Sequence, residues 1–328
     1  MTTLGGLTAE TLAGPPAVGA DGVEPRVIEG RSPWQLAFER LRHDRVAIGS
    51  SVVIVLIAAM AVFAPLVAHI VGHGPNTQYR TTGLTQAGIP VGPSSTFLLG
   101  TDELGRDVLV RVFYGAQISL LVGVVASGIA VAVGVLLGML AGYLGRVVDT
   151  VLARFFDVVL AMPYLVFAIA LFAALQDRGG LALSIAVISF FSFASVARIV
   201  RGQVLSIKEK EYVEAARSLG ANSWRIMFVD ILPNVMAQVI VYFTLLVPLS
   251  IVFEATLAFL GIGVLPPTAD WGSMLSESIQ YYQVAWWYLV FPGLALLLTT
   301  LSFNLLGDSV RDAFDPRYNR VFRRKVRG

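Results

Sequence analysis

The stretch Arg201–Asn234 reads RGQVLSIKEKEYVEAARSLGANSWRIMFVDILPN and interrupts, with polar residues, a chain that is otherwise strongly apolar. Ser206 and Glu209 have the spacing of a capping box, in which each side chain satisfies a free backbone N–H at the start of a helix. This pattern predicts a helix through KEKEYVEAARSL, because most of these residues favour helices. Gly220 is expected to end the helix, since glycine readily adopts the left-handed conformation found at helix ends.

A second short helix is predicted in the same stretch. Asn222 or Ser223 can cap its start, and Pro233 is expected to end it. Two helices in a polar loop between apolar runs favour a surface that is presented to a soluble partner. The alternative is an amphipathic loop helix that contacts only solvent or the membrane surface.

The composition indicates an integral membrane protein. Of the 328 residues, 56% are hydrophobic and only 14% are charged, and the mean hydropathy is +0.73. Soluble domains usually carry about 25% charged residues. The net charge of +2 is too small to favour nucleic acid as a partner. The chain has no cysteine, and its three histidines lack metal-binding spacing, so neither a disulfide nor a metal site is expected.

Six apolar segments are each long enough, at about 20 residues, to cross the hydrocarbon layer of a membrane. Before them, residues 1–30 are expected to be disordered, and WQLAFERLRHDR (34–45) to form a short amphipathic helix. The expected units are an N-terminal tail (1–45), a membrane domain (46–310) and a basic C-terminal tail (311–328). We expect the spans at about 46–70, 112–144, 155–175, 181–199, 235–263 and 286–307, with the polar loop at 200–234.

The distribution of basic residues predicts the orientation of the chain. Lys and Arg are frequent in the polar loop and in the C-terminal tail, whereas the segment 265–285 contains neither. Cytoplasmic loops are enriched in Lys and Arg, so both termini and the polar loop are expected on the cytoplasmic side. The basic tail is also suited to contact with anionic membrane lipid.

Three glycines recur at four-residue spacing in the second span. Gly134, Gly138 and Gly142 form a stripe without side chains on one face of the expected helix. Such a stripe lets a neighbouring helix approach closely, so a helix contact is predicted here.

Several residues of the polar loop match a known motif. The EAA triplet at 214–216, with Gly220 and the Leu-Pro pair at 232–233, resembles the EAA loop of ABC importer permeases. Asp230 departs from that pattern, which often has an aliphatic residue three positions before the proline. The resemblance implies that the loop docks into a groove of an ATP-hydrolysing subunit and transmits its motion. The residues implied in this coupling are Tyr212, Glu214, Ala215, Ala216, Ser218, Leu219, Gly220 and Ala221.

A second match precedes the second span. LGTDELGRDVLVRVFYGAQISLL, residues 99–121, resembles a segment of the C-type permease of dipeptide and oligopeptide importers. Within it, Asp102, Arg106 and Asp107 can pair locally and serve a structural role. A role in the substrate pathway is the alternative.

Two later segments extend this resemblance. EATLAFLGIG (254–263) resembles the ExxLxFLGLG run of the same branch, and FNLLGD with RDAFDPR (303–317) resembles its C-terminal end. A carboxylate inside a span is costly, so Glu254 is expected to face the protein interior, water or a partner. It can contact the amino end of a peptide in the pathway, or it can form a structural pair.

The resemblance covers residues 34–317 and implies an all-α membrane protein. The implied fold is the six-span bundle of a type I ABC importer permease with cytoplasmic coupling helices, in the bacterial plasma (inner) membrane. The implied partners are a second homologous permease, two nucleotide-binding ATPase subunits, an extracytoplasmic substrate-binding protein and a peptide substrate. No cofactor is expected in this chain, because ATP and Mg²⁺ would bind to the ATPase subunits.

No enzymatic role is expected for this chain. It contains no GxxxxGK[ST] phosphate-binding loop, and no catalytic group can be assembled from its motifs. Two alternatives to a peptide permease stay open, namely a nickel permease of the same branch and an ion-driven secondary carrier. Such carriers often show inverted repeats and paired broken helices, and the sequence indicates neither.

Overall fold

The computed structural model describes residues 33–175 and 180–315 of the chain. The expected disordered tail (1–30) and the basic residues beyond position 315 lie outside the described residues. Within the described residues the fold is helical throughout, apart from two isolated β-bridges, and this confirms the predicted all-α class. The helices are α1 (Pro33–His43), α2 (Arg45–Val71), α3 (Val108–Leu144), α4 (Arg146–Ala161), α5 (Tyr164–Leu175), α6 (Leu181–Ile207), α7 (Glu211–Ser218), α8 (Ser223–Arg225), η3 (Ile226–Ile231), α9 (Leu232–Phe259), α10 (Trp271–Ser278) and α11 (Trp286–Phe314).

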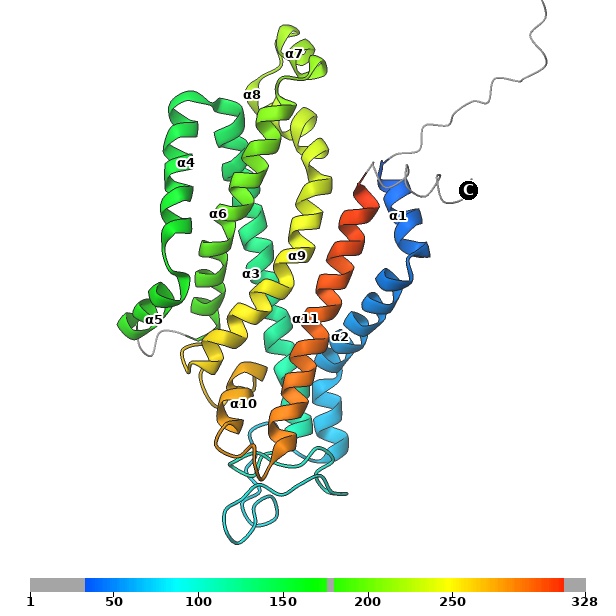
Figure 1. Cartoon of the computed structure of the whole chain (residues 1–328), viewed down its shortest axis with the longest axis vertical. Coiled ribbons are helices and arrows are strands. Elements are labelled where there is room, and N and C mark those ends of the chain that lie inside the picture. Colours follow the sequence, from blue (N-terminus) through cyan, green and yellow to red (C-terminus); the bar gives the residue numbers. More distant parts are fainter. Residues whose placement is uncertain (1–32, 176–179, 316–328) are drawn as a thin grey trace, which may run out of the picture.

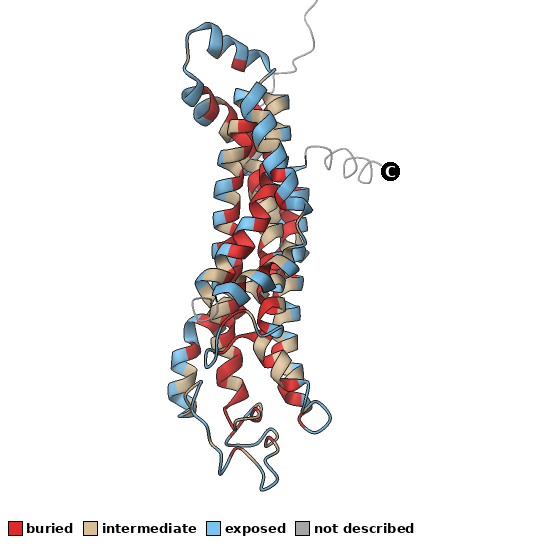
Figure 2. Ribbon diagram, turned by 90° about the vertical axis from the view of Figure 1, so that its left-hand side faces the viewer, coloured by how far each residue is buried: buried red, intermediate tan, exposed pale blue. Residues whose placement is uncertain are grey.

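The long helices form an elongated bundle (Figure 1). Helix α3 packs against α6 on one side, and α9, α11 and α2 complete the bundle. The short helices α7 and α8 stand at one end, and α10 lies near the other end beside the long α2–α3 connection (Figure 1). Buried residues follow the inner faces of the helices, while the connecting segments at both ends are largely exposed (Figure 2).

Among the residues that the structure describes, five helices are long and apolar enough to cross a membrane, and a bent pair makes a sixth candidate. The five are α2, α3, α6, the continuous helix Ser223–Phe259, and α11. The sixth is α4 with α5, which meet at 83°. Five or six spans agree with the fold class that the sequence predicts.

The break between α4 and α5 was not predicted, and it divides the expected third span (155–175). Helix α4 ends at Ala161, and Pro163 precedes the first residue of α5. Proline lacks an N–H group and its ring clashes with the preceding turn, so a helix bends or ends at this position. A sequence that reads as one apolar run therefore forms two helices that point in different directions.

The capping box predicted at Ser206 and Glu209 is wrong. Helix α6 continues through Ser206 and ends at Ile207, and α7 begins only at Glu211. At the start of α7, Lys210 occupies the capping position without a side-chain hydrogen bond. The apolar face of α6 explains the difference, because Val204 is fully buried and holds the helix in the bundle beyond the expected end of the span.

Pro233 does not end the second helix, contrary to the prediction. Segment η3 is a π-helix, whose last bond runs from the Leu232 N–H to the Met227 carbonyl. Pro233 then occupies the first turn of α9, where its missing N–H is tolerated. The Asn234 side chain donates to the Asp230 carbonyl at 2.7 Å. Helix α8, η3 and α9 consequently form one uninterrupted helix of 37 residues.

Helix α1 packs against the end of α11. Arg40 donates to the carbonyl oxygens of Ala313 (2.8 Å) and Asp315 (3.1 Å), which lie at the C-terminal end of α11. The ring of Trp34 contacts Phe314 edge-on at 5.2 Å, while Phe38 stays 70% exposed. The amphipathic helix expected here is therefore formed, and one of its faces is fixed to the bundle.

The glycine stripe of α3 makes the predicted helix contact. A Cβ atom at Gly134 would lie 2.7 Å from the Cβ of Val196, and one at Gly138 would lie 2.6 Å from the carbonyl oxygen of Ala197. A Cβ atom at Gly142 would lie 2.7 Å from the Cβ of Val204. Real Cβ atoms do not approach this closely, so α6 can lie at its present distance only because α3 carries glycine.

We predict that Gly138→Val destabilises the protein, since the added side chain would collide with the α6 backbone. Overpacking of this kind costs about 1–3 kcal/mol. The control is Gly128→Val on the same helix, where an added Cβ would meet no atom within 4 Å. Thermal unfolding of the full chain in detergent measures the difference. Equal stability of the two variants would show that the stripe does not set the α3–α6 distance.

Candidate functional site

The end of α7 has the geometry that the sequence predicts. Gly220 adopts a left-handed conformation with φ of +81°. Its N–H donates to the Arg217 carbonyl at 3.0 Å, and the N–H of Ala221 donates to the Ala216 carbonyl at 3.1 Å. These two bonds form a Schellman motif, which satisfies carbonyl groups that the helix end leaves free. Gly220 therefore produces the sharp reversal that leads into the second helix.

The predicted coupling residues divide between two faces of α7 and its turn. Two predicted residues, Ala216 and Ala221, pack against a buried cluster of Val213, Ile226, Met227 and Ile231, although Val213 itself was not predicted. The other predicted residues face outward, and Leu219 is 88% exposed. The outward set is Tyr212, Glu214, Ala215, Ser218, Leu219 and Gly220.

The loop is joined rigidly to the membrane helices on both sides. Lys208 donates from its Nζ to the Gly142 carbonyl at 3.1 Å, which ties the end of α6 to the end of α3. Asn222 caps α8, because its Oδ1 accepts the Arg225 N–H at 2.7 Å. From α8 the helix continues into α9 without a break. These contacts, with the buried cluster around Val213, link α7 and α8 to the ends of α3, α6 and α9.

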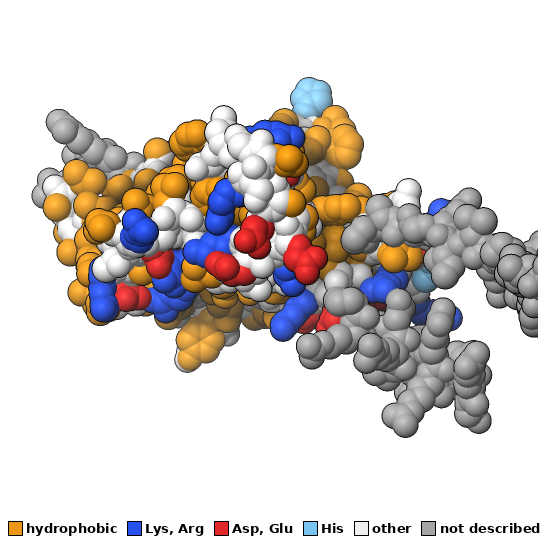
Figure 3. Space-filling model, turned by 90° about the horizontal axis from the view of Figure 1, so that it is seen from above, with side chains coloured by type: hydrophobic (Ala, Val, Ile, Leu, Met, Phe, Trp, Pro, Cys, Tyr) orange, Lys and Arg blue, Asp and Glu red, His pale blue; other side chains and the backbone are white. Residues whose placement is uncertain are grey.

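Charged side chains of both signs gather at the end of the molecule that carries α7 (Figure 3). Asp230, the departure from the family pattern, lies close by in η3. Its Oδ2 is buried and has no hydrogen-bond partner among the described residues. Burial raises the pKa of Tyr212 above its ordinary value, and the nearby Asp230 carboxylate raises it further.

A buried ionic cluster lies at the opposite end of the bundle. Arg106 donates to Asp102 at 2.5 Å and to Glu277 at 3.0 Å, and Arg111 Nε lies 3.3 Å from Asp102. Tyr288 also donates to Glu277, at 2.5 Å. Burial raises the pKa of Asp102, although the two arginines oppose this shift. The cluster joins the segment between α2 and α3 to helices α3, α10 and α11.

Sequence reasoning found only part of this cluster. The pairing of Asp102 with Arg106 agrees with the expected local pair, but Asp107 lies in a different interaction. Its carboxylate accepts the Leu109 N–H at 2.8 Å as the cap of α3, and it contacts His73 at 2.6 Å. Arg111 was not singled out, although an arginine inside an apolar run is itself a signal for a buried ion pair.

Glu254 is fully buried between α9, α3 and the start of α10. Ser119 donates to its Oε2 at 3.2 Å, and its Oε1 has no partner among the described residues. Asp270, which caps α10 by accepting the Ser273 N–H at 2.8 Å, lies near enough to interact with it electrostatically. Burial of Glu254 agrees with the expectation that it faces the protein interior, and neither of its two expected roles is tested by this geometry.

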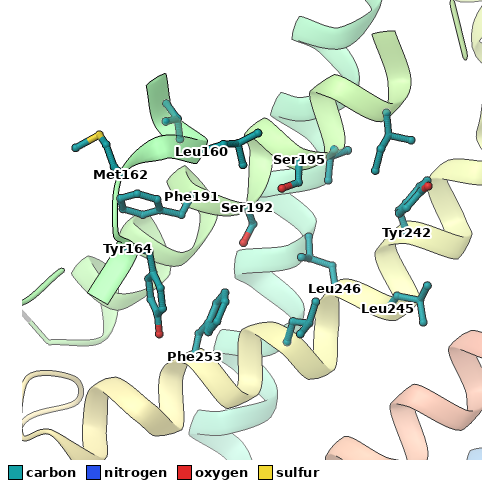
Figure 4. Close-up of a pocket in the computed structure, with 14 residues that line it drawn as sticks. Leu160, Met162, Tyr164, Phe191, Ser192, Ser195, Tyr242, Leu245, Leu246 and Phe253 are labelled. Carbon is teal, nitrogen blue, oxygen red and sulfur yellow. The ribbon is translucent and has the colours of Figure 1, made fainter. Parts of the chain in front are cut away.

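A cavity of about 380 Å³ opens between the α4–α5 break, α6 and α9 (Figure 4). The rings of Tyr164, Phe191 and Phe253 lie on one side of it, and Ser192 and Ser195 project from α6 (Figure 4). Tyr164 contacts Phe253 with ring centroids 4.4 Å apart. None of the described residues that line the cavity carries a charge. Sequence reasoning missed this site, because the break at Pro163 that forms it was not predicted.

Residues 134–320 match the family described as the inner membrane component of binding-protein-dependent transport systems. Residues 32–86 match the N-terminal transmembrane domain of oligopeptide transport permease C.

Relatives of known name cover most of the chain. It is 41% identical to the di/tripeptide transport system permease protein DppC of Pseudomonas aeruginosa, over 87% of this chain and 93% of that protein. It is 38% identical to the oligopeptide transport system permease protein OppC of Bacillus subtilis, over 92% of this chain and 96% of that protein. It is 37% identical to the glutathione transport system permease protein GsiD of Pectobacterium atrosepticum, over 88% of this chain and 92% of that protein. With its membrane helices and these matches, the chain belongs to the family of inner membrane components of binding-protein-dependent transport systems.

Proposed function

We propose that this chain is a permease subunit of an ATP-binding-cassette importer for di- or oligopeptides. The observation that carries the proposal is the outward face of α7 and its turn, which is exposed at the end of a bundle of apolar helices and rigidly joined to them. The names of the relatives support the substrate class, since dipeptides, oligopeptides and glutathione are all peptides.

The proposed assembly has five subunits of four kinds. This chain and a second, homologous permease form the pathway between them, and each permease docks on one of two ATPase subunits through its coupling helices. An extracytoplasmic binding protein delivers the peptide. ATP and Mg²⁺ bind to the ATPase subunits, and their closure moves α7 and α8 and thereby α6 and α9. Such a rigid-body motion can open the pathway alternately to the two sides of the membrane.

Dependence on separate ATPase subunits tests this function. The purified chain is expected neither to bind nor to hydrolyse ATP, because its sequence has no phosphate-binding loop. Peptide uptake is expected only when the ATPase subunits are expressed with it. Uptake by this chain alone, driven by a proton gradient, would instead identify a secondary carrier.

The proposed orientation places both termini and the α6–α9 loop in the cytoplasm. Reporter tags at position 320 and within 206–222 are expected to be inaccessible from outside the cell. Tags near Asn76 or Ser273 are expected to be accessible, because the segments around these residues join membrane helices at the opposite end of the bundle (Figure 1). Labelling of intact cells with an impermeant reagent measures accessibility. A tag at Ser273 that is protected in intact cells would contradict this topology.

The coupling role predicts a specific defect for Glu214→Lys and Gly220→Leu. Glu214 is exposed and can make charge-assisted hydrogen bonds to a partner, which a lysine would replace with repulsion. A leucine at position 220 is destabilised in the left-handed conformation by an energy of order 1–2 kcal/mol. It also adds bulk at the proposed docking surface. Both variants are expected to reach the membrane in normal amounts, to lose the ATPase on co-purification and to lose peptide uptake.

Two control variants separate docking from folding. Glu209→Lys makes the same change of charge on an exposed residue of the same loop that precedes α7. Gly220→Asn keeps the left-handed turn, which asparagine tolerates better than leucine does. Both controls are expected to retain the ATPase. If Glu214→Lys and Gly220→Leu also retain it and transport normally, the loop is not the coupling element.

A further inference from the structure

The cavity beside the α4–α5 break has unused hydrogen-bonding groups on an otherwise apolar wall. The Tyr164 hydroxyl is buried without a hydrogen-bond partner among the described residues. Ser192, Ser195 and Tyr242 also line the cavity, and their hydroxyls make no hydrogen bond to any residue that the structure describes. A buried polar group without a partner is costly, so the Tyr164 hydroxyl is suited to a ligand that supplies one. The other three residues line the cavity, where a ligand can reach their hydroxyls.

Other serines of the same helix show what a hydroxyl does when no ligand is needed. Ser184 donates to the Gly180 carbonyl at 3.3 Å, and Ser189 donates to the Ile185 carbonyl at 2.6 Å. Such bonds to the preceding turn satisfy a serine inside a membrane helix without outside help. Ser192 and Ser195 lie further along α6 and leave this bond unmade on the side that faces the cavity (Figure 4).

The apolar part of the cavity has the character of a side-chain pocket. Tyr164, Phe191 and Phe253 form a ring cluster, with centroid distances of 4.4 Å and 6.0 Å from Tyr164. The volume of about 380 Å³ is at the small end of the range for ligand pockets, which is about 300–1,000 Å³. With no charge on the lining, a charged side chain would lose its hydration here without gaining a partner.

The combination of rings and free hydroxyls selects among the possible occupants. A lipid chain offers no hydrogen-bonding groups. A helix of a second permease satisfies its backbone groups internally and so offers few. An extended peptide carries free N–H and C=O groups along its backbone together with side chains. It alone of the three can use both parts of the wall.

We propose that this cavity is a contact site for the peptide in transit. The ring cluster accepts an apolar side chain, and the hydroxyls of Tyr164, Ser192, Ser195 and Tyr242 bond to the peptide backbone. The inference rests on the proposed function, and it adds a preference for peptides with an apolar side chain at the position that meets the rings.

Filling the cavity tests the proposal. Ser195 is exposed on α6, so Ser195→Phe adds a ring to the cavity without disturbing the buried core. The full transporter is reconstituted in vesicles. Uptake of Ala-Phe-Ala is then compared with uptake of Ala-Ala-Ala, each peptide being present at a concentration that saturates the binding protein. We expect Ser195→Phe to lower uptake of Ala-Phe-Ala about tenfold more than uptake of Ala-Ala-Ala. The matched control, Ala186→Phe, is also exposed on α6 but does not line the cavity, and is expected to leave the ratio unchanged.

A second variant tests the hydroxyl groups. Tyr164→Phe removes an oxygen that has no partner within the described protein, so folding is expected to be unaffected. If the hydroxyl bonds to the peptide backbone, the KM for both peptides rises about fivefold, as expected for one lost hydrogen bond. An unchanged KM would overturn the assignment of the hydroxyls to the backbone.

The remaining outcomes separate this inference from the proposed function. If Ser195→Phe lowers uptake of both peptides equally and the second permease no longer co-purifies with the variant, the cavity is a subunit interface. If uptake of neither peptide changes, the cavity is occupied by lipid and not by the peptide. Both results overturn the inference while the wild-type transporter still takes up peptide. If the wild-type transporter takes up neither peptide, the proposed function itself fails, and the inference fails with it.

Discussion

The close contact between α3 and α6 is the constraint on which the rest of this structure depends. Three glycines at one-turn spacing let the α6 backbone approach α3 more closely than any side chain would allow. That contact continues to the ends of both helices, where Lys208 bonds to the carbonyl of Gly142. The position of α7 is therefore fixed by helix packing inside the membrane. In a membrane, where apolar contact with lipid is always available, small residues are a principal means of holding helices together.

The other end of the bundle is held by charge. Asp102, Arg106, Arg111 and Glu277 bring together segments that are far apart in the sequence. Removing one partner of such a cluster leaves the others buried and unpaired, which is far more costly than losing a surface pair. The two ends are thus stabilised differently. Steric fit sets the helices at the end that carries α7, and paired charges order the segments that connect the helices at the opposite end.

The sequence predicted the features that depend on local pattern. Apolar run lengths gave the membrane helices, glycine spacing gave the α3–α6 contact, and Gly220 gave the helix end. The errors arose where packing overrides local signals. Ser206 has good capping geometry, but buried neighbours such as Val204 extend α6 through it. Pro233 reads as a helix end, yet it lies in the first turn of α9, directly after the π-helical segment, and the helix continues through it. The partners of Arg111 and the cavity could not be predicted, because both depend on how distant helices meet.

The length of α3 has a consequence for the surroundings of the loop that carries α7. Its 37 residues span about 55 Å, against a hydrocarbon layer of about 30 Å. About 25 Å of α3 must therefore lie outside the hydrocarbon layer, at one end or divided between both. At the Leu144 end, Gly142 accepts the Lys208 hydrogen bond beside the loop that carries α7. Any part of the extra length at that end separates this loop from the hydrocarbon layer by a stiff helix, so the loop keeps its distance from the layer without further contacts.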